Sequence, residues 1–288
     1  MIAQPLHREQ LWNEVGTVID ALTEFGVKLP SGLKRRDKRE PGRQRKEAAE
    51  LRMYRALRSY WRGQAERIRE KVETRAALMG MRFDATPPTW WEQEFDEAFW
   101  KNEDKKLTPV LLKLNSTNSV DGVTLFAEGV RIGMDYTLTN SEAEAWAREY
   151  TFGLVKDINN TTRTDLRNRL TTFINTPGYT IGDLMSSLPF NETRARAVSI
   201  TEVTRAYAQG NMVAGKQLKK EFPDVRVVKT WYTNNDDLVC EICEPLDGME
   251  VELDEGFTTA KDKREGLDGP PAHVNCRCWM RTTTKIRK

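Results

Sequence analysis

The sequence predicts a mainly α-helical protein: a helical N-terminal body followed by a small α+β module at the C-terminus that a zinc ion clips together. Three observations lead to this expectation. Apolar residues recur every three or four positions through most of the first 220 residues, as on the buried face of a helix. The spacing changes to alternate positions at residues 225–232, which is typical of a strand. All four cysteines then lie in two short segments, a pattern that favours a metal site.

Length and composition bound the class of protein. A chain of 288 residues is long enough for two domains and a sizeable core. With 39% hydrophobic and 31% charged residues, it is expected to be soluble, and no apolar run approaches the ~20 residues that span a bilayer. The N-terminus lacks the pattern of a signal peptide, so we expect the cytoplasm, where thiols stay reduced. We expect three parts: a helix and basic linker at 1–43, a helical body at 44–189, and a C-terminal module at 190–288.

The first 79 residues are expected to contain two helices joined by a linker. Apolar spacing predicts a short helix over 11–22, and breakers bracket a charged linker at 30–42 that is expected to be mobile until it meets a partner. A second helix is expected from 44 to 79, where one apolar stripe continues for some 35 residues, roughly 50 Å at 1.5 Å per residue. Such a stripe needs a partner helix.

The middle of the chain is expected to be helical in shorter pieces. After Pro87-Pro88, the acidic and aromatic stretch at 90–101 predicts a helix whose aromatic face packs into the core. Ser141 and Glu144 fit a capping box, in which each side chain satisfies a free backbone amide at a helix start. The further helices are expected at 120–134, 141–154 and 158–173.

The last part combines a helix with a small antiparallel sheet. A helix is expected at 192–220, with small residues such as Gly210 in its apolar stripe that allow a neighbouring helix to approach closely. The strands are expected at 225–232, 249–253 and 276–282. The polar segment 258–269 is expected to be an exposed loop.

Charge is distributed unevenly although the net charge is only +2. Residues 31–80 contain 16 Lys and Arg against 7 Asp and Glu, whereas residues 81–160 contain 8 against 14. A basic segment indicates contact with something anionic, of which nucleic acid is the obvious candidate; the alternative is a solvated helix face rich in arginine. The candidate nucleic-acid contacts are Lys34, Arg35, Arg36, Lys38 and Arg39.

The cysteine motifs are the strongest chemical signal. Cys240 and Cys243 form a CxxC turn, and His273, Cys276 and Cys278 form an HxxCxC run. Two such turns can supply four soft ligands to one tetrahedral zinc ion, and a closed shell of thiolates would make that zinc structural. Five candidates compete for four places: three of the cysteines are expected ligands, while His273 and Cys278 compete for the last place.

Two other interpretations of the cysteines stay open. Two disulfides between the turns would also use all four residues, and the cysteines could be small apolar residues of a core without a ligand. Their clustering and the expected cytoplasmic compartment favour a metal.

The same residues resemble a known family. The sequence around the cysteines resembles the C-terminal signature of phage head morphogenesis proteins, the Mu F-like minor head proteins, and Ile200–Ala206 with Gly210 is similar to the helix that precedes this signature. The resemblance covers about residues 190–282. The residues that carry it are Trp231, Asn235-Asp236, the CxxC turn, Leu246-Asp247-Gly248, Phe257, Pro270-Pro271, His273 and Asn275-Cys276-Arg277-Cys278.

The resemblance implies a minor head protein that acts in procapsid assembly and head morphogenesis. Its partners would be the portal protein and other procapsid components, with contact to packaged double-stranded DNA also allowed, and no membrane. It would belong to the virion, in the capsid interior or near the portal, and to the host cytoplasm during assembly. No enzymatic activity is implied.

Two alternatives are a zinc-containing DNA-binding protein and a metal-dependent nuclease with His273 as base and Asn275 orienting it. Only two histidines are present, there is no HExxH motif or Gly-rich phosphate loop, and three or four thiolates tend to close the position that a catalytic zinc keeps open.

Overall fold

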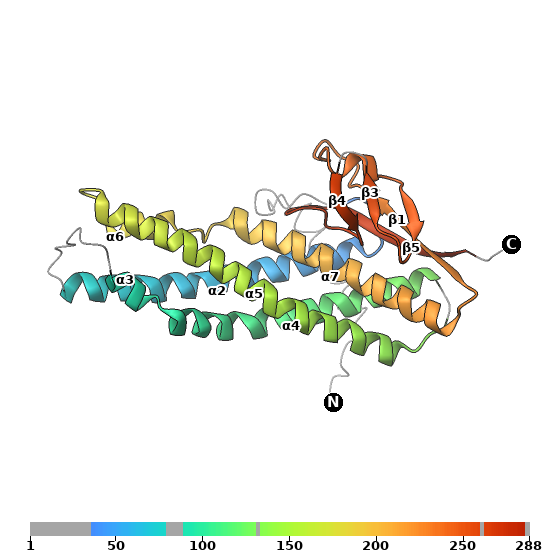
Figure 1. Ribbon diagram of the computed structural model, residues 1–288, viewed down its shortest axis with the longest axis horizontal. Helices are drawn as coiled ribbons and strands as arrows, with labels where there is room; N and C mark the ends of the chain where they lie inside the picture. Colours follow the sequence, from blue (N-terminus) through green and yellow to red (C-terminus); the bar gives the residue numbers. More distant parts are fainter. Residues whose placement is uncertain (1–35, 79–88, 131–132, 260–261, 286–288) are drawn as a thin grey trace, which may run out of the picture. The chain divides into compact units, whose positions relative to one another are not determined.

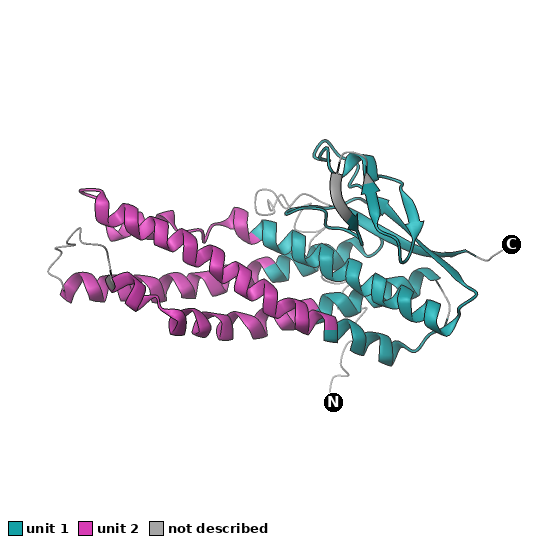
Figure 2. Ribbon diagram, in the orientation of Figure 1, with its two compact units in different colours: residues 1–53, 116–145, 196–288 teal, residues 54–115, 146–195 magenta. Residues whose placement is uncertain are grey.

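The computed structural model describes residues 36–78, 89–130, 133–259 and 262–285 (Figure 1). The chain forms two compact units, coloured in Figure 2: residues 1–53, 116–145 and 196–288 make unit 1, and residues 54–115 and 146–195 make unit 2. The expected fold class is confirmed, because long helices make up most of the chain and the strands are confined to the C-terminal part. The helix expected at 11–22 lies outside the described residues.

The observed elements follow the expected order. Four of them lie within two residues of the expected bounds: the helices expected at 44–79 and 192–220, and the strands expected at 225–232 and 249–253. The elements are α2 (Arg43–Leu78), α3 (Thr89–Glu94), α4 (Glu97–Val130), α5 (Tyr136–Asn175), α6 (Ile181–Ser187), α7 (Glu192–Glu221), β1 (Arg226–Tyr232), the 3-10 helix η1 (Glu244–Leu246), β2 (Glu250–Glu252), β3 (Phe257–Thr259), β4 (Asp262–Leu267) and β5 (Trp279–Lys285).

The middle helices are longer than the sequence pattern indicates. The aromatic stretch expected at 90–101 divides into α3 and the start of α4, where the Asp96 carboxylate accepts a hydrogen bond from the Phe99 amide at 2.9 Å. The helix expected at 120–134 is the second half of α4, and those expected at 141–154 and 158–173 merge into α5. Apolar spacing finds the buried stretches of a helix but not the polar turns between them.

The capping box expected at Ser141 is wrong. Ser141 lies inside α5, where its hydroxyl donates to the carbonyl of Thr137 one turn earlier at 3.0 Å. The structure has a capping box at the start of α6 instead, where the Thr180 hydroxyl accepts from the Asp183 amide at 3.1 Å. A Ser followed three residues later by an acid therefore fits the motif without starting a helix.

The exposed loop expected at 258–269 is also wrong in part, because β3 and β4 form a two-stranded antiparallel hairpin there. Its backbones approach so closely at two glycines that a Cβ on Gly256 would lie 2.6 Å from the Gly266 Cα. Backbone pairing builds this hairpin from a segment without apolar alternation, so a search for apolar alternation misses it. The strand expected at 276–282 begins three residues later, at Trp279.

Unit 2 has a core to which α2, α3, α4, α5 and α6 contribute, and half of its buried residues are aromatic. This confirms that the aromatic face of the 90–101 stretch packs into the core. The buried residues are Ile68, Val72, Trp90, Trp91, Phe95, Phe99, Trp100, Leu166, Leu170, Phe173, Leu184 and Leu188.

Unit 1 combines helix pairing with a three-stranded antiparallel sheet in the order β2-β1-β5. The helices α4 and α7 meet at two glycines: a Cβ on Gly210 would lie 2.0 Å from the Ser119 carbonyl oxygen and 2.9 Å from the Gly122 Cα. This confirms the expected close approach. Apolar residues of α4, α7 and the sheet share one core, including Phe126, Val213 and Val227.

Among the residues that the structure describes, no helix carries an apolar stretch long enough to cross a lipid bilayer.

Candidate metal centre

Both cysteine segments lie at the same end of the sheet: the first follows β1 and the second precedes β5. In the antiparallel pairing of β1 with β5, the last residue of β1, Tyr232, lies opposite the first residue of β5, Trp279, and their rings stack with centroids 4.3 Å apart. The chain leaves β1 directly into the segment that carries Cys240 and enters β5 directly after Cys278. Strand pairing therefore brings together two segments more than 30 residues apart.

Each segment forms a tight turn that presents its ligand atoms. The amides of Cys243 and Glu244 donate to the carbonyl of Cys240 at 3.0 and 2.9 Å, and the Cys276 amide donates to the carbonyl of His273 at 3.3 Å. Asn275, between the ligands of the second turn, has φ +64°, a left-handed conformation that asparagine adopts more readily than most residues. Both turns therefore fold two ligand atoms back toward each other.

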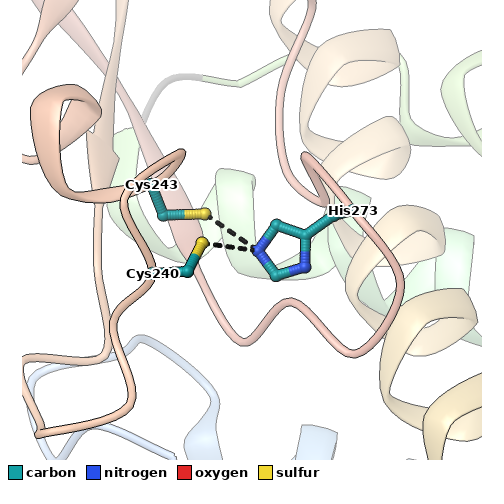
Figure 3. Close-up of side chains that lie close together, drawn as sticks. All are labelled: Cys240, Cys243 and His273. Carbon is teal, nitrogen blue, oxygen red and sulfur yellow. Dashed lines mark hydrogen bonds between the residues drawn. The ribbon is translucent and has the colours of Figure 1, made fainter.

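The first group of ligand atoms joins the two turns. The His273 Nε2 lies 3.1 Å from the Cys240 Sγ and 3.2 Å from the Cys243 Sγ, as Figure 3 shows. A second group consists of Cys243, Cys276 and Cys278, with 3.8 Å between the Cys243 and Cys276 sulfurs. Cys243 belongs to both groups, so all five expected ligands gather around it. The structure contains no disulfide among them.

These distances fit a tetrahedral zinc ion. Sulfur ligands about 2.3 Å from zinc lie about 3.8 Å from one another in a tetrahedron, and a sulfur and an imidazole nitrogen lie about 3.6 Å apart. The separation of the Cys243 and Cys276 sulfurs already matches, and the two nitrogen–sulfur distances need to widen by a few tenths of an ångström. Thiolate and imidazole are also ligands that suit zinc, whereas calcium and magnesium prefer oxygen ligands. The residues present therefore fit this ion.

The histidine is oriented for binding through Nε2. Its Nδ1 lies 2.9 Å from the carbonyl oxygen of Val274, and because a carbonyl can only accept, Nδ1 carries the proton. Nε2 is then the ring atom directed at the two sulfurs. A backbone partner on the other ring nitrogen is the usual support of a metal-binding histidine.

The electrostatics of the cluster are those of several thiols that cannot all ionise without a cation. Hydrogen bonds from the Cys243 and Cys278 thiols hold the pKa of Cys276 far below its ordinary value. The hydrogen bond between Cys243 and Cys276 raises the pKa of Cys243, because Cys243 keeps its proton while it donates to the Cys276 thiolate. The hydrogen bond with Cys276 also raises the pKa of His273 to about 9. A divalent cation would remove this competition, since a coordinated thiol is deprotonated outright.

Helix α7 supports the second turn through two threonines that the motif search did not identify as site residues. The Thr201 hydroxyl accepts from the Asn275 amide at 2.8 Å, and the Thr204 hydroxyl lies 3.3 Å from the Cys276 carbonyl oxygen, to which it donates. The two threonines lie three residues apart on one face of the helix. Nothing in the sequence distinguishes these two threonines from exposed threonines of a helix, so their contacts with the second turn become visible only in the fold.

Arg277 of the second turn is bound to the segment that precedes the first turn. Its guanidinium donates to the Asp236 carboxylate at 2.9 Å, with 2.7 Å to the second carboxylate oxygen. Although burial alone raises the pKa of Asp236, the hydrogen bonds from Asn234 and Arg277 lower it below its ordinary value. This ion pair braces the segment before the CxxC turn against the HxxCxC turn.

The candidate nucleic-acid contacts do not share one environment. Arg36 is buried and donates to Glu40, Glu50 and Thr204 at 2.9, 2.8 and 2.6 Å. The linker expected to be mobile is therefore folded into unit 1 from Arg36 onward, because this buried charge is compensated there. Lys38 is exposed, and Arg39 is exposed and bonded to Asp37. Lys34 and Arg35 lie outside the described residues.

Comparison with known proteins gives one finding. Residues 156–281 match the family model described as phage Mu protein F like protein. This range includes the second part of α5, all of α7 and both cysteine turns. Comparison with curated proteins and with solved structures finds no significant match.

Proposed function

We propose, from the premise that residues 156–281 belong to the phage Mu protein F like family, that this chain is a minor head protein that acts at the portal during procapsid assembly. Membership of that family supports a function in phage head morphogenesis. The observation that carries the proposal is that the matched range contains α7 and both cysteine turns, which meet at one end of the sheet. The chain then acts in the virion by binding rather than by catalysis.

The metal belongs to this proposal as a structural element. We assign a zinc ion to Cys240, Cys243, Cys276 and His273, because His273 contacts two of these sulfurs and has a backbone partner on its other ring nitrogen. Cys278 is not part of this set, although its sulfur lies within 4.8 Å of the Cys243 and Cys276 sulfurs. When bound, the ion would close the two turns with about 10 kcal/mol or more of apparent binding free energy. A closed shell of this kind leaves no open position for a substrate.

Co-assembly with the portal tests the function. The full chain, co-expressed with the portal protein of the same phage, should purify with the portal ring and should enter procapsids. A matched variant, Cys243→Ser, should lose both properties, because the turns would open. Normal infectious heads from a phage that lacks this chain would contradict the assignment. Magnesium- or manganese-dependent cleavage of DNA by the purified protein would instead favour the nuclease alternative.

Contact with packaged DNA is the second part of the proposal, and it depends on exposed cations. Lys38 and Arg39 are the described candidates that face solvent. We expect Lys38→Glu/Arg39→Glu to weaken binding to a DNA duplex. The slope of log K against the logarithm of salt concentration should become shallower by about two, since each neutralised phosphate contributes about one to it. A titration at several salt concentrations measures this.

Arg45→Glu is a control for charge reversal outside this segment, since Arg45 lies in α2 and pairs with Glu128. A slope unchanged in Lys38→Glu/Arg39→Glu would leave this segment as a solvated face.

A further inference from the structure

The outer surface of the CxxC turn combines exposed aliphatic side chains with carboxylates that lack a counter-charge. We name this surface the knuckle face. It consists of Asp237, Leu238, Glu241, Ile242 and Glu244 from the first turn and Val274 from the second.

Three aliphatic residues of the knuckle face are exposed to solvent. Leu238 is 48% exposed, Ile242 40% and Val274 68%. Ile242 lies between the two cysteines of the CxxC turn and Val274 directly follows His273, so the contacts between His273 and both cysteines place these side chains on adjoining turns. Single exposed apolar residues need no explanation, but a group of them on adjoining turns is a candidate interaction surface.

The charge around these side chains has one sign. Residues 230–260 contain nine Asp and Glu and no Lys or Arg. Away from the knuckle face several of these acids are paired: Glu250 with Lys285, Glu252 with Arg226, and Asp254 with Lys219. In the part of the chain that the structure describes, no cation forms an ion pair with Asp237, Glu241 or Glu244. The uncompensated negative charge is therefore concentrated where the aliphatic side chains are exposed.

This combination determines what the surface can bind. Phosphate groups would be repelled, so the knuckle face is not a nucleic-acid site. A protein segment with Lys or Arg beside large apolar side chains would gain both the burial of apolar area and the pairing of charges. We propose that the knuckle face is the docking site for a basic, amphipathic segment of another protein. The inference goes beyond the assembly function, because it rests only on exposure and charge.

A defined peptide tests the inference on the full, zinc-loaded chain. The probe is an 18-residue peptide of leucine and lysine whose leucines share one helical face. Two further peptides replace leucine by serine or lysine by glutamate. We expect the leucine–lysine peptide to bind at least about tenfold more tightly than either of the others. Equal binding of the serine peptide would overturn the proposal, since charge alone would then explain it.

Variants place the binding on the knuckle face. Leu238→Ser/Ile242→Ser/Val274→Ser and, separately, Glu241→Lys/Glu244→Lys should each weaken binding of the leucine–lysine peptide about tenfold. The matched control is Phe152→Ser/Glu149→Lys, which changes an exposed aromatic residue and an exposed acid on α5 and should leave binding unchanged. Zinc content and thermal midpoint verify the fold of each variant. If the apolar variant does not fold, the result for the charge variant decides the test.

Two results would overturn the proposal. One is unchanged peptide binding in a folded charge variant. The other is concentration-dependent self-association of the wild type, measured by sedimentation, that the apolar variant abolishes. The knuckle face would then be covered by a second copy of this chain.

Discussion

His273 and Cys278 compete for one place in the metal centre, and the residues around them differ. The imidazole contacts two sulfurs and is oriented by the Val274 carbonyl, whereas Cys278 is buried behind Cys243 and Cys276. We expect His273→Ala to lose most of the bound zinc and Cys278→Ser to keep about one zinc per chain, both measured by elemental analysis of the purified protein. Full zinc in His273→Ala and none in Cys278→Ser would reverse the assignment.

Glu103 in unit 2 carries a pH dependence of stability. Burial alone raises the pKa of this carboxyl, but the hydrogen bonds and charges of Arg67 and Lys106 outweigh it and hold the pKa below the ordinary value of 4.5. The unfolded chain therefore binds the proton first as the pH falls below 4.5, so the stability that Glu103 contributes is present above this pH and decreases as the pH falls toward the folded pKa.

Urea unfolding at several pH values tests this. At pH 7, Glu103→Gln should lower the free energy of unfolding by about 2 kcal/mol, because it leaves a partly buried Arg67 without its carboxylate. The difference from wild type should become smaller below pH 4.5, while the effects of all other carboxylates cancel in the comparison. A difference that does not depend on pH would show that the ion pair contributes nothing through its charge.

At the scale of elements, the crossing of α4 and α7 depends on two glycines. Gly210→Ala would place a methyl group 2.0 Å from the Ser119 carbonyl oxygen, so the helices must separate, and we expect a loss of about 2–3 kcal/mol. Gly153→Ala in α5 is the matched control, since a Cβ there meets nothing within 4 Å and should stabilise the helix by about 0.5–1 kcal/mol. Chemical denaturation compares the two. Equal effects would mean that the crossing adjusts without cost.

The elements also show what the sequence could predict. Long apolar stripes predicted α2 and α7, and alternation predicted β1, because each of these patterns results from burial on one side. The five metal-site residues could be identified because clustered cysteines are rare. Thr201, Thr204 and Arg36 could not, since a threonine on a helix or an arginine in a charged segment has the same pattern whether exposed or buried. Their roles depend on which distant residues the fold places beside them. The expected division into 1–43, 44–189 and 190–288 stays a prediction.

At the scale of the whole molecule, the two units differ in what stabilises them. The core of unit 2 consists of aliphatic and aromatic residues without a cysteine, whereas the cysteines of unit 1 form a small core of their own with Trp231, Leu246, Phe257 and Ala272. We expect removal of zinc by a chelator to open residues 233–278 to protease before residues 89–115 and 146–175, as mass spectrometry of the fragments would show. Simultaneous cleavage of both parts would mean that the metal stabilises the entire chain.

The buried guanidinium of Arg36 has a consequence for the order in which the protein can be made. Its hydroxyl partner, Thr204, lies 168 residues further along the chain, and that hydroxyl in turn reaches the Cys276 carbonyl. A ribosome releases the N-terminal end first, so Arg36 emerges together with its carboxylate partners Glu40 and Glu50 but well before the Thr204 hydroxyl that completes its hydrogen bonds. Unit 1 therefore closes only when synthesis is nearly complete, and until then the nascent chain keeps these surfaces open to chaperones.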